Sequence, residues 1–243
     1  MDVALFVPCY INQFYPQVAI ATLELLEKTG CRVHFPLGQT CCGQPLANAG
    51  FAKNGHECLV QMEALFAPYD WVVAPAASCV LHTKEHAPAF QGRLFELCEF
   101  LTDVLKIQSL DARFPYRVAL HTSCHGLRGL RLAGMSERVE TPFSKPAFLL
   151  NLVRDLQLVG LQRPDECCGF GGTFSVTEEA VSAKMGLDRL ADFHRSGAEV
   201  IAGTDISCLM HLSALRHPNN PHHPDPHPPV PPQFLHIAEI LNQ

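Results

Sequence analysis

Short apolar runs alternate along the chain with longer segments in which apolar residues recur every three or four positions. The short runs are rich in Val, Ile, Leu and Phe, and they predict strands at residues 3–7, 31–36, 71–74, 117–122, 156–161 and 199–203. The longer segments predict helices at residues 16–28, 51–66, 94–107, 177–195 and 236–241. Strands that alternate with helices favour parallel βαβ units, so we expect an α/β fold with small parallel sheets flanked by helices.

One cysteine pattern occurs twice. Cys41-Cys42-Gly43 recurs as Cys167-Cys168-Gly169, whereas the composition predicts only about 0.03 copies of this tripeptide by chance. In each half a lone cysteine follows an apolar run upstream of the pair, and a Ser-Cys dipeptide follows another apolar run downstream. The complete sets are Cys9, Cys41, Cys42 and Cys79 in the first half and Cys124, Cys167, Cys168 and Cys208 in the second. We therefore expect two duplicated domains, residues 1–112 and 113–243.

A proline- and histidine-rich segment interrupts the second half. Residues 216–233 contain eight Pro and four His in 18 positions. Such a composition buries too little apolar surface to fold, so we expect a mobile insertion whose histidines bind metal only adventitiously.

Charge and length exclude several classes of function. The 243 residues carry 18 basic and 24 acidic side chains, a net charge of −6, without a basic stripe. Nucleic-acid binding depends on clustered Lys and Arg, so it is not expected. Apolar runs stay well below the roughly 20 residues that cross a bilayer, and we expect no transmembrane segment. The chain starts without a basic leader, which predicts a cytoplasmic protein.

The cysteines indicate the chemistry. In a reducing cytoplasm, eleven cysteines, an odd number, point to metal binding or redox chemistry more than to structural disulfides. A glycine after each vicinal pair permits the sharp turn that brings both sulfurs to one site. Four thiolates from three loops suit an iron–sulfur cluster or tetrahedral zinc. Thiol–disulfide chemistry or inert burial is the alternative. Cys31, Cys58 and Cys98 lie outside the pattern, and we expect them to be buried and inert.

The motifs resemble those of the cysteine-rich CCG-domain family. This family includes the cysteine-rich subunit of heterodisulfide reductase, the iron–sulfur subunit of glycolate oxidase and, with the greatest likeness, the lactate-utilisation proteins. The resemblance covers nearly the whole chain and rests on residues 39–45, Ser78-Cys79, residues 121–125, residues 167–175, residues 208–210 and residues 236–239. The string Cys167-Cys168-Gly169-Phe170-Gly171-Gly172 is highly specific.

The resemblance implies an iron–sulfur electron-transfer subunit of an oxidoreductase complex. The eight patterned cysteines would hold one or two clusters of the [4Fe–4S] type, with zinc as an alternative in one half. The complex would oxidise L-lactate, or another 2-hydroxy acid, to pyruvate without NAD, together with an iron–sulfur protein and a further utilisation subunit. The chain lacks a Gly-x-Gly-x-x-Gly motif, so we expect no flavin or nicotinamide site of its own. We therefore expect a subunit that is not an autonomous enzyme.

One departure from the family pattern leaves the ligand set open. In the heterodisulfide reductase relatives the last motif is Cys-x-x-Cys, whereas here His82 and His211 stand three residues after Cys79 and Cys208. Each histidine is either a substitute ligand, as in Rieske centres, or a surface or core residue.

Other charged residues and other functions also stay open. His121, His125 and Arg128 near Cys124 either stabilise thiolate charge or pair structurally. The rival functions are a zinc-binding or thiol-switch protein and cluster-based disulfide reduction.

Overall fold

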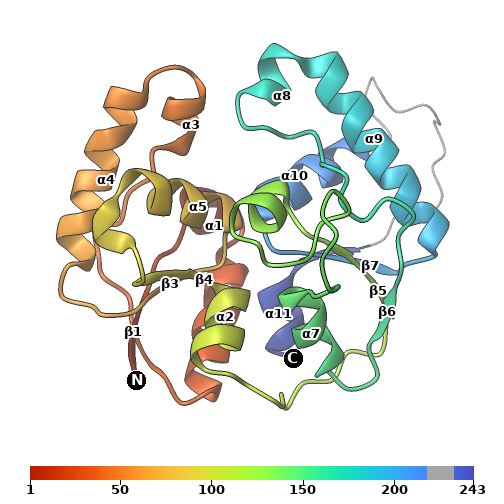
Figure 1. Ribbon diagram of the computed structural model, residues 1–243, viewed down its shortest axis with the longest axis horizontal. Coiled ribbons are helices and arrows are strands. Elements are labelled where there is room, and N and C mark those ends of the chain that lie inside the picture. The colour runs from red at the N-terminus through yellow and green to blue at the C-terminus, as the bar shows by residue number, and fades with distance from the viewer. Residues whose placement is uncertain (218–232) are drawn as a thin grey trace. The chain divides into compact units, whose positions relative to one another are not determined.

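The computed structural model describes residues 1–217 and 233–243. Backbone contacts divide the chain into two compact units, residues 1–108 with Asn242 and residues 109–241 with Gln243. Figure 1 shows that each unit consists of a small sheet with helices packed against it.

Both units contain a parallel four-stranded sheet of the same topology. The strands of the first unit are β1 (Asp2–Leu5), β2 (Arg32–His34), β3 (Val72–Ala74) and β4 (Leu94–Glu96), in the order β2-β1-β3-β4. Those of the second are β5 (Arg117–His121), β6 (Gln157–Val159), β7 (Val200–Gly203) and β8 (Gln233–His236), in the order β6-β5-β7-β8. The identical strand order confirms the predicted α/β class and the duplication of its βαβ units.

Helices cover the sheets of both units. The first unit contains α1 (Cys9–Phe14), α2 (Pro16–Lys28), α3 (Gln44–Asn48), α4 (Ala52–Phe66), α5 (Ala77–His86), η1 (Pro88–Phe90), α6 (Leu97–Glu99) and η2 (Phe100–Val104). The second contains η3 (His125–Gly129), α7 (Lys145–Asn151), α8 (Phe174–Thr177), α9 (Glu179–Ser196), α10 (Ile206–Leu215) and α11 (Ile237–Leu241). In Figure 1, α7 and α11 lie on one side of the second sheet, and α9 and α10 lie on the other.

The core of each unit lies between its inner strands and the apolar faces of the helices. β3 is completely buried, and in β1 only Asp2 is exposed. Continuous apolar strands of this kind are typical of parallel sheets covered on both faces. The helix predicted at 16–28 has these bounds in the structure, with Pro16 in its first turn, where no backbone N–H is needed.

Two predicted helices begin with a strand instead. Residues 94–107 form β4 followed by α6 and the π-helical turn η2, and residues 236–241 follow β8, whose last residue is His236. Both strands are edge strands of three or four residues, too short for a period of two to stand out from the helical spacing that follows. The helix predicted at 177–195 begins at Glu179, because Glu178 leaves the helical conformation and separates α8 from α9.

Of the predicted insertion at 216–233, residues 218–232 lie outside the described residues. Its ends are corrected by the structure, because Arg216 caps α10 and Gln233 begins β8. Within residues 1–217 and 233–243, the longest apolar helices fall short of what a bilayer crossing requires.

Candidate metal centres

Four cysteines of the first unit come together at the carboxyl ends of its strands. Cys9 is the first residue of α1 after β1, the Cys41–Cys42 pair lies in the loop between β2 and α3, and Cys79 lies in the first turn of α5 after β3. The sulfurs of Cys9 and Cys41 are 3.9 Å apart. Thiol hydrogen bonds continue from Cys41 to Cys42 and from Cys42 to Cys79. We call these four residues the first quartet.

The second unit repeats the arrangement. Cys124 follows β5, the Cys167–Cys168 pair lies in the loop between β6 and α8, and Cys208 lies in the first turn of α10 after β7. Thiol hydrogen bonds connect Cys124 to Cys167, Cys167 to Cys168, and Cys168 to Cys208. These four residues are the second quartet. The carboxyl ends of strands are where parallel α/β sheets bind ligands, and here each edge carries four thiols.

A tightly packed glycine shapes each cysteine pair. Gly43 has a φ of 87°, and a Cβ on it would lie 2.4 Å from the carbonyl oxygen of Gly55 in α4. Gly169 has a φ of 88°, and its Cβ would lie 2.5 Å from the carbonyl oxygen of Ser182 in α9. Only glycine fits both the left-handed backbone and the contact with the helix. The two glycines therefore turn the chain so that adjacent cysteine sulfurs reach one site.

Backbone N–H groups point at the sulfurs of both quartets. Gly43 N donates to Cys41 Sγ at 3.4 Å, and Gly169 N donates to Cys167 Sγ at 3.4 Å. In the second quartet Phe170 N also donates to Cys168 Sγ at 3.5 Å. Such bonds stabilise thiolates and, in iron–sulfur proteins, tune the cluster.

One cysteine of each quartet, Cys41 or Cys167, accepts hydrogen bonds from two neighbouring thiols, and these bonds favour its thiolate form. Hydrogen bonds from Cys42 and Cys9 hold the pKa of Cys41 far below its ordinary value. Hydrogen bonds from Cys124 and Cys168 do the same to the pKa of Cys167. The same hydrogen bonds raise the pKa of the donor thiols Cys9, Cys42, Cys124 and Cys168. The thiolate is the form that ligates metals, so each quartet has one cysteine that favours this form and three further soft sulfur ligands. Four sulfurs from three loops, with N–H donors around them, fit a thiolate-held metal or iron–sulfur centre in each unit.

The second quartet has a buried histidine beside it, His121, which the sequence suggested either as a group that stabilises thiolate charge or as a structural partner. A ring nitrogen of His121 and the sulfurs of Cys168 and Cys208 all lie within 4.8 Å of one another. His121 is 1% exposed, and its Nε2 has no hydrogen-bond partner among the described residues. Burial lowers the pKa of His121 to about 3, with a further contribution from Arg189, so the ring is neutral.

Arg189 is the functional candidate that the sequence analysis missed. Its side chain is completely buried, and its Nε donates to His121 Nδ1 at 3.3 Å. Burial lowers the pKa of Arg189, and electrostatic interactions with Asp192, Glu166 and Cys168 act in the opposite direction and stabilise its charge. The only signal in the sequence is an arginine on the apolar side of α9, which by itself is indistinguishable from a solvent-exposed arginine.

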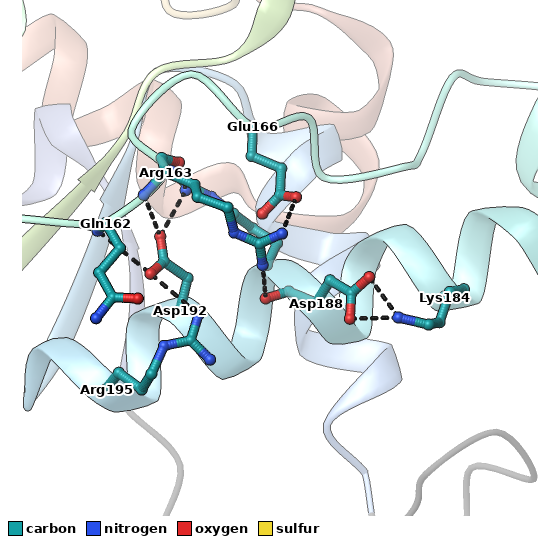
Figure 2. Close-up of polar contacts among 8 residues, drawn as sticks. Gln162, Arg163, Glu166, Lys184, Asp188, Asp192 and Arg195 are labelled. Atoms are coloured by element: carbon teal, nitrogen blue, oxygen red, sulfur yellow. Dashed lines mark hydrogen bonds and ion pairs between the residues drawn. The ribbon is translucent and has the colours of Figure 1, made fainter.

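The loop before Cys167 is fixed to α9 by a polar network (Figure 2). The buried carboxylate of Asp192 accepts hydrogen bonds from the backbone nitrogens of Gln162 and Arg163 at 3.3 and 3.1 Å. The Arg163 side chain in turn forms an ion pair with Glu166 and donates to the Asp188 carbonyl. The position of the second cysteine pair therefore depends on α9.

His82 and His211, three residues after Cys79 and Cys208, lie near the quartets. His82 is 6% exposed, its ring is stacked on that of His86 with centroids 4.4 Å apart, and it interacts electrostatically with Cys41. His211 Nε2 lies 3.4 Å from the Ser182 hydroxyl. His211 Nε2 is therefore positioned to hydrogen-bond with Ser182 rather than to bind a metal together with the sulfurs of the second quartet.

The remaining candidates are mostly structural. Arg128 pairs with Glu137 and donates to the Asp165 carbonyl on the surface, so it does not face the second quartet's thiolates. His125 Nδ1 lies 3.6 Å from Cys124 Sγ. Of the other cysteines, Cys31 and Cys98 are buried as expected, whereas Cys58 is partly exposed. Burial explains the first two. Cys58 corrects the expectation because it is partly exposed, and partial burial and the nearby Cys41 raise the pKa of its thiol.

Comparisons with known proteins agree with the duplicated cysteine pattern. A family model described as "CCG: Cysteine-rich domain" matches residues 3–84 and 118–213. A protein named lactate utilization protein A from Geobacillus kaustophilus (strain HTA426) is 38% identical over 256 residues, covering 100% of this chain and 99% of the relative. The protein of the same name from Bacillus licheniformis is 35% identical, with the same coverage.

A solved structure supports the fold alone. A hypothetical protein from Helicobacter pylori matches 98% of this chain with a TM-score of 0.60 at 12% identity, and this chain spans 47% of its length. The family follows from the sequence relatives and the two matched domains. The chain belongs to the cysteine-rich CCG-domain family of lactate utilization protein A.

Proposed function

We propose that this protein is the iron–sulfur electron-transfer subunit of a complex that oxidises L-lactate to pyruvate without NAD. The observation that carries the proposal is the pair of thiol quartets, each assembled from three loops at the carboxyl edge of a parallel sheet. The name of the relatives supports lactate utilisation as the process.

The protein's own residues bind the centres and control their surroundings. Cys9, Cys41, Cys42 and Cys79 would hold one [4Fe–4S] cluster, and the second quartet would hold another. A bound cluster supplies one-electron transfer. The glycine N–H groups on Cys41 and Cys167 stabilise the added negative charge, and partial burial limits access of water and oxygen.

The substrate chemistry belongs to partner subunits in this proposal. Two-electron oxidation of a hydroxy acid releases a hydride equivalent, and a cluster accepts single electrons, so a separate cofactor on a partner would divide the pair. We propose that this partner and a further iron–sulfur protein belong to the same lactate-utilisation system, and that the complex works in the cytoplasm.

Metal analysis of protein purified without oxygen tests the proposal. Iron, zinc and acid-labile sulfide would be measured in the wild type, in Cys168→Ser and in the control Cys31→Ser, whose thiol is buried outside both quartets. We expect iron with matching sulfide in the wild type and the control, and a loss of iron in Cys168→Ser.

Other outcomes point to other functions. One or two equivalents of zinc without sulfide would contradict the proposal and favour a structural or thiol-switch protein. Oxidation of lactate by the isolated chain would contradict the subunit role. Turnover of a disulfide by the isolated chain with a low-potential electron donor would indicate disulfide reduction at the cluster instead.

A further inference from the structure

The two quartets differ in one buried pair of side chains. Val3-Ala4-Leu5-Phe6 and Val118-Ala119-Leu120-His121 occupy the same place before the lone cysteine of each half. Phe6 is fully buried and lies edge-on to Phe66 of α4, with ring centroids 5.9 Å apart. His121 lies edge-on to Phe193 of α9 at 6.0 Å. A histidine in the second unit therefore replaces a phenylalanine of the first in the same packing environment.

The same comparison shows that the position of Arg189 in the second unit is equivalent to that of a methionine in the first. Gly55 and Ser182 are equivalent, because their carbonyls make the same close contact with the glycine of the cysteine pair. Counting seven residues along each helix from these contacts leads to Met62 in α4 and Arg189 in α9. Met62 is 1% exposed and Arg189 is completely buried. The first unit fills the position with an apolar side chain, and the second unit places a positive charge there.

A buried arginine is costly to the fold unless its environment compensates for the lost water. Its partners are the carbonyls of Arg163 and Pro164, the carboxylate of Asp192 at 3.4 Å, and the ring of Phe193 at 4.5 Å from Cζ. The Nε–H donor is directed at His121 Nδ1. Since an apolar residue fills the equivalent position of the first unit, packing alone does not explain this arrangement.

The hydrogen bond from Arg189 decides which nitrogen of His121 carries the proton. A guanidinium can only donate, so Nδ1 of the neutral ring must be the acceptor. The ring proton is then on Nε2, the nitrogen that has no partner among the described residues. A protonated Nε2 cannot ligate a metal. It can donate a hydrogen bond, and the ring lies within 4.8 Å of the sulfurs of Cys168 and Cys208.

We propose that His121 and Arg189 form a hydrogen-bonding relay that directs the His121 Nε2–H at the sulfur atoms of the centre held by the second quartet, making this centre more easily reduced than the centre of the first. The inference rests on the proposed function. An N–H donor stabilises the extra negative charge of a reduced centre, and the nearby guanidinium adds a positive charge to the same side. The first unit offers Phe6 and Met62 at these positions, which stabilise no charge.

The first unit supplies the variants for the test. His121→Phe and Arg189→Met introduce the residues that the first unit already accommodates, and His121→Gln keeps a side-chain N–H donor. His194→Gln changes an exposed histidine on the same helix and is the control. Redox titration of the intact, cluster-loaded protein would be followed by electron paramagnetic resonance, so that the two centres are measured separately.

We expect two midpoint potentials in the wild type. His121→Phe should lower the higher one by about 59 mV or more, equal to a tenfold change in the ratio of oxidised to reduced centres at a fixed potential for a one-electron couple. Arg189→Met should shift the same centre in the same direction, whereas His121→Gln should restore part of the loss. His194→Gln and the lower midpoint should not change.

A second measurement does not depend on the potentials. Nitrogen-15 NMR of histidine-labelled full-length protein, with zinc in place of iron to avoid paramagnetic broadening, reports the tautomer of His121. We expect the proton on Nε2 in the wild type and a mixture of tautomers in Arg189→Met. A proton on Nδ1 in the wild type would overturn the relay, even if His121→Phe failed to retain the second centre.

The outcomes separate this inference from the proposed function. Protein that contains neither iron nor sulfide would contradict both. Protein that contains two iron–sulfur centres, with midpoints that His121→Phe leaves unchanged, would contradict the relay alone.

Discussion

At the scale of single residues, the buried Glu96 shows how the fold uses a carboxyl group that belongs to neither quartet. Its Oε2 accepts hydrogen bonds from the backbone nitrogens of Cys98 and Glu99 and so caps α6. Its Oε1 has no partner among the described residues. Complete burial raises the pKa of Glu96 to about 8. The folded protein therefore retains a proton that the unfolded chain releases at a pKa near 4.5.

This difference predicts a pH dependence of stability. Between pH 4.5 and 8 the folded state binds more protons than the unfolded state. The contribution of Glu96 to the free energy of unfolding is therefore fully present below pH 4.5, and it is lost as the pH rises to 8. Glu96→Gln removes the titration and keeps an oxygen for the cap. Relative to the wild type, the variant should gain about 2–4 kcal/mol of unfolding free energy between pH 5 and pH 8. Urea unfolding of both proteins at each pH measures this, and a constant difference across the range would contradict it.

The histidines after Cys79 and Cys208 give a second prediction at this scale. His211 Nε2 lies 3.4 Å from the Ser182 hydroxyl, and His82 stacks on His86, so thiolates alone should hold the centres. His82→Gln and His211→Gln should retain the wild-type content of iron, because replacing a histidine that is not a ligand removes no bond to the metal. Iron and sulfide analysis after anaerobic purification decides this. Loss of iron from either variant would identify that histidine as a ligand.

At the scale of elements, the sequence was most informative where a glycine or proline marks a boundary. Pro16 begins α2, and Gly43 and Gly169 mark the turns at the cysteine pairs. The edge strands β4 and β8 were missed because three or four residues carry too little periodicity. Both are followed by the same cap, in which the side chain of Glu99 or Glu239 accepts from the backbone nitrogen at the strand end. Aligning the two halves would have revealed the strands.

The turn at each cysteine pair provides a matched test of why glycine is required. Gly43 and Gly50 both have a φ of 87°, but a Cβ on Gly43 would meet the Gly55 carbonyl at 2.4 Å, whereas a Cβ on Gly50 would meet nothing within 4 Å. Gly50→Ala should cost about 1–2 kcal/mol of stability from the left-handed backbone alone. Gly43→Ala should cost more and should separate the sulfurs of the first quartet.

Iron content and urea unfolding distinguish the two effects. We expect Gly50→Ala to retain its iron, and Gly43→Ala to lose the iron of the first unit while the second unit keeps its own. Equal iron in the two variants would mean that the contact with α4 is not what positions the cysteine pair. Gly169→Ala should reproduce the result in the second unit, because its Cβ would meet the Ser182 carbonyl at 2.5 Å.

At the scale of the whole molecule, duplication explains why the sequence predicted so much of the candidate site. The two quartets were recognisable because the same residue types recur in the same order in both halves. His121 was recognised only as a candidate beside Cys124, and its partner Arg189 was missed, because the halves differ at these two positions and a difference between repeats gives no signal without a structure. Burial of Arg189 depends on the packing of α9 against the loop at 162–166, which no local pattern encodes.

The division into two units also predicts how metal is lost. All members of the first quartet lie within residues 1–108, and all members of the second lie within residues 109–241. Cys42 and Cys168 are the most buried members, each 2% exposed and each hydrogen-bonded to two other thiols of its own quartet. A serine at either position should remove one centre and leave the other, because sites without shared partners respond independently.

Cys42→Ser and Cys168→Ser should therefore each lose about half of the iron and sulfide, and the double variant should lose nearly all of both. In the redox titration Cys42→Ser should show only the higher midpoint, and Cys168→Ser should show only the lower one. This result would assign each midpoint potential to its unit. Cys31→Ser is the control for thiol loss outside the quartets. If one single variant lost all of the iron, the chain would hold one centre, or the two would assemble in sequence, and the independence of the units would be wrong. If the losses are additive, the duplication has kept two separate centres, and the Phe6-to-His121 difference becomes the means by which one chain holds them at different potentials.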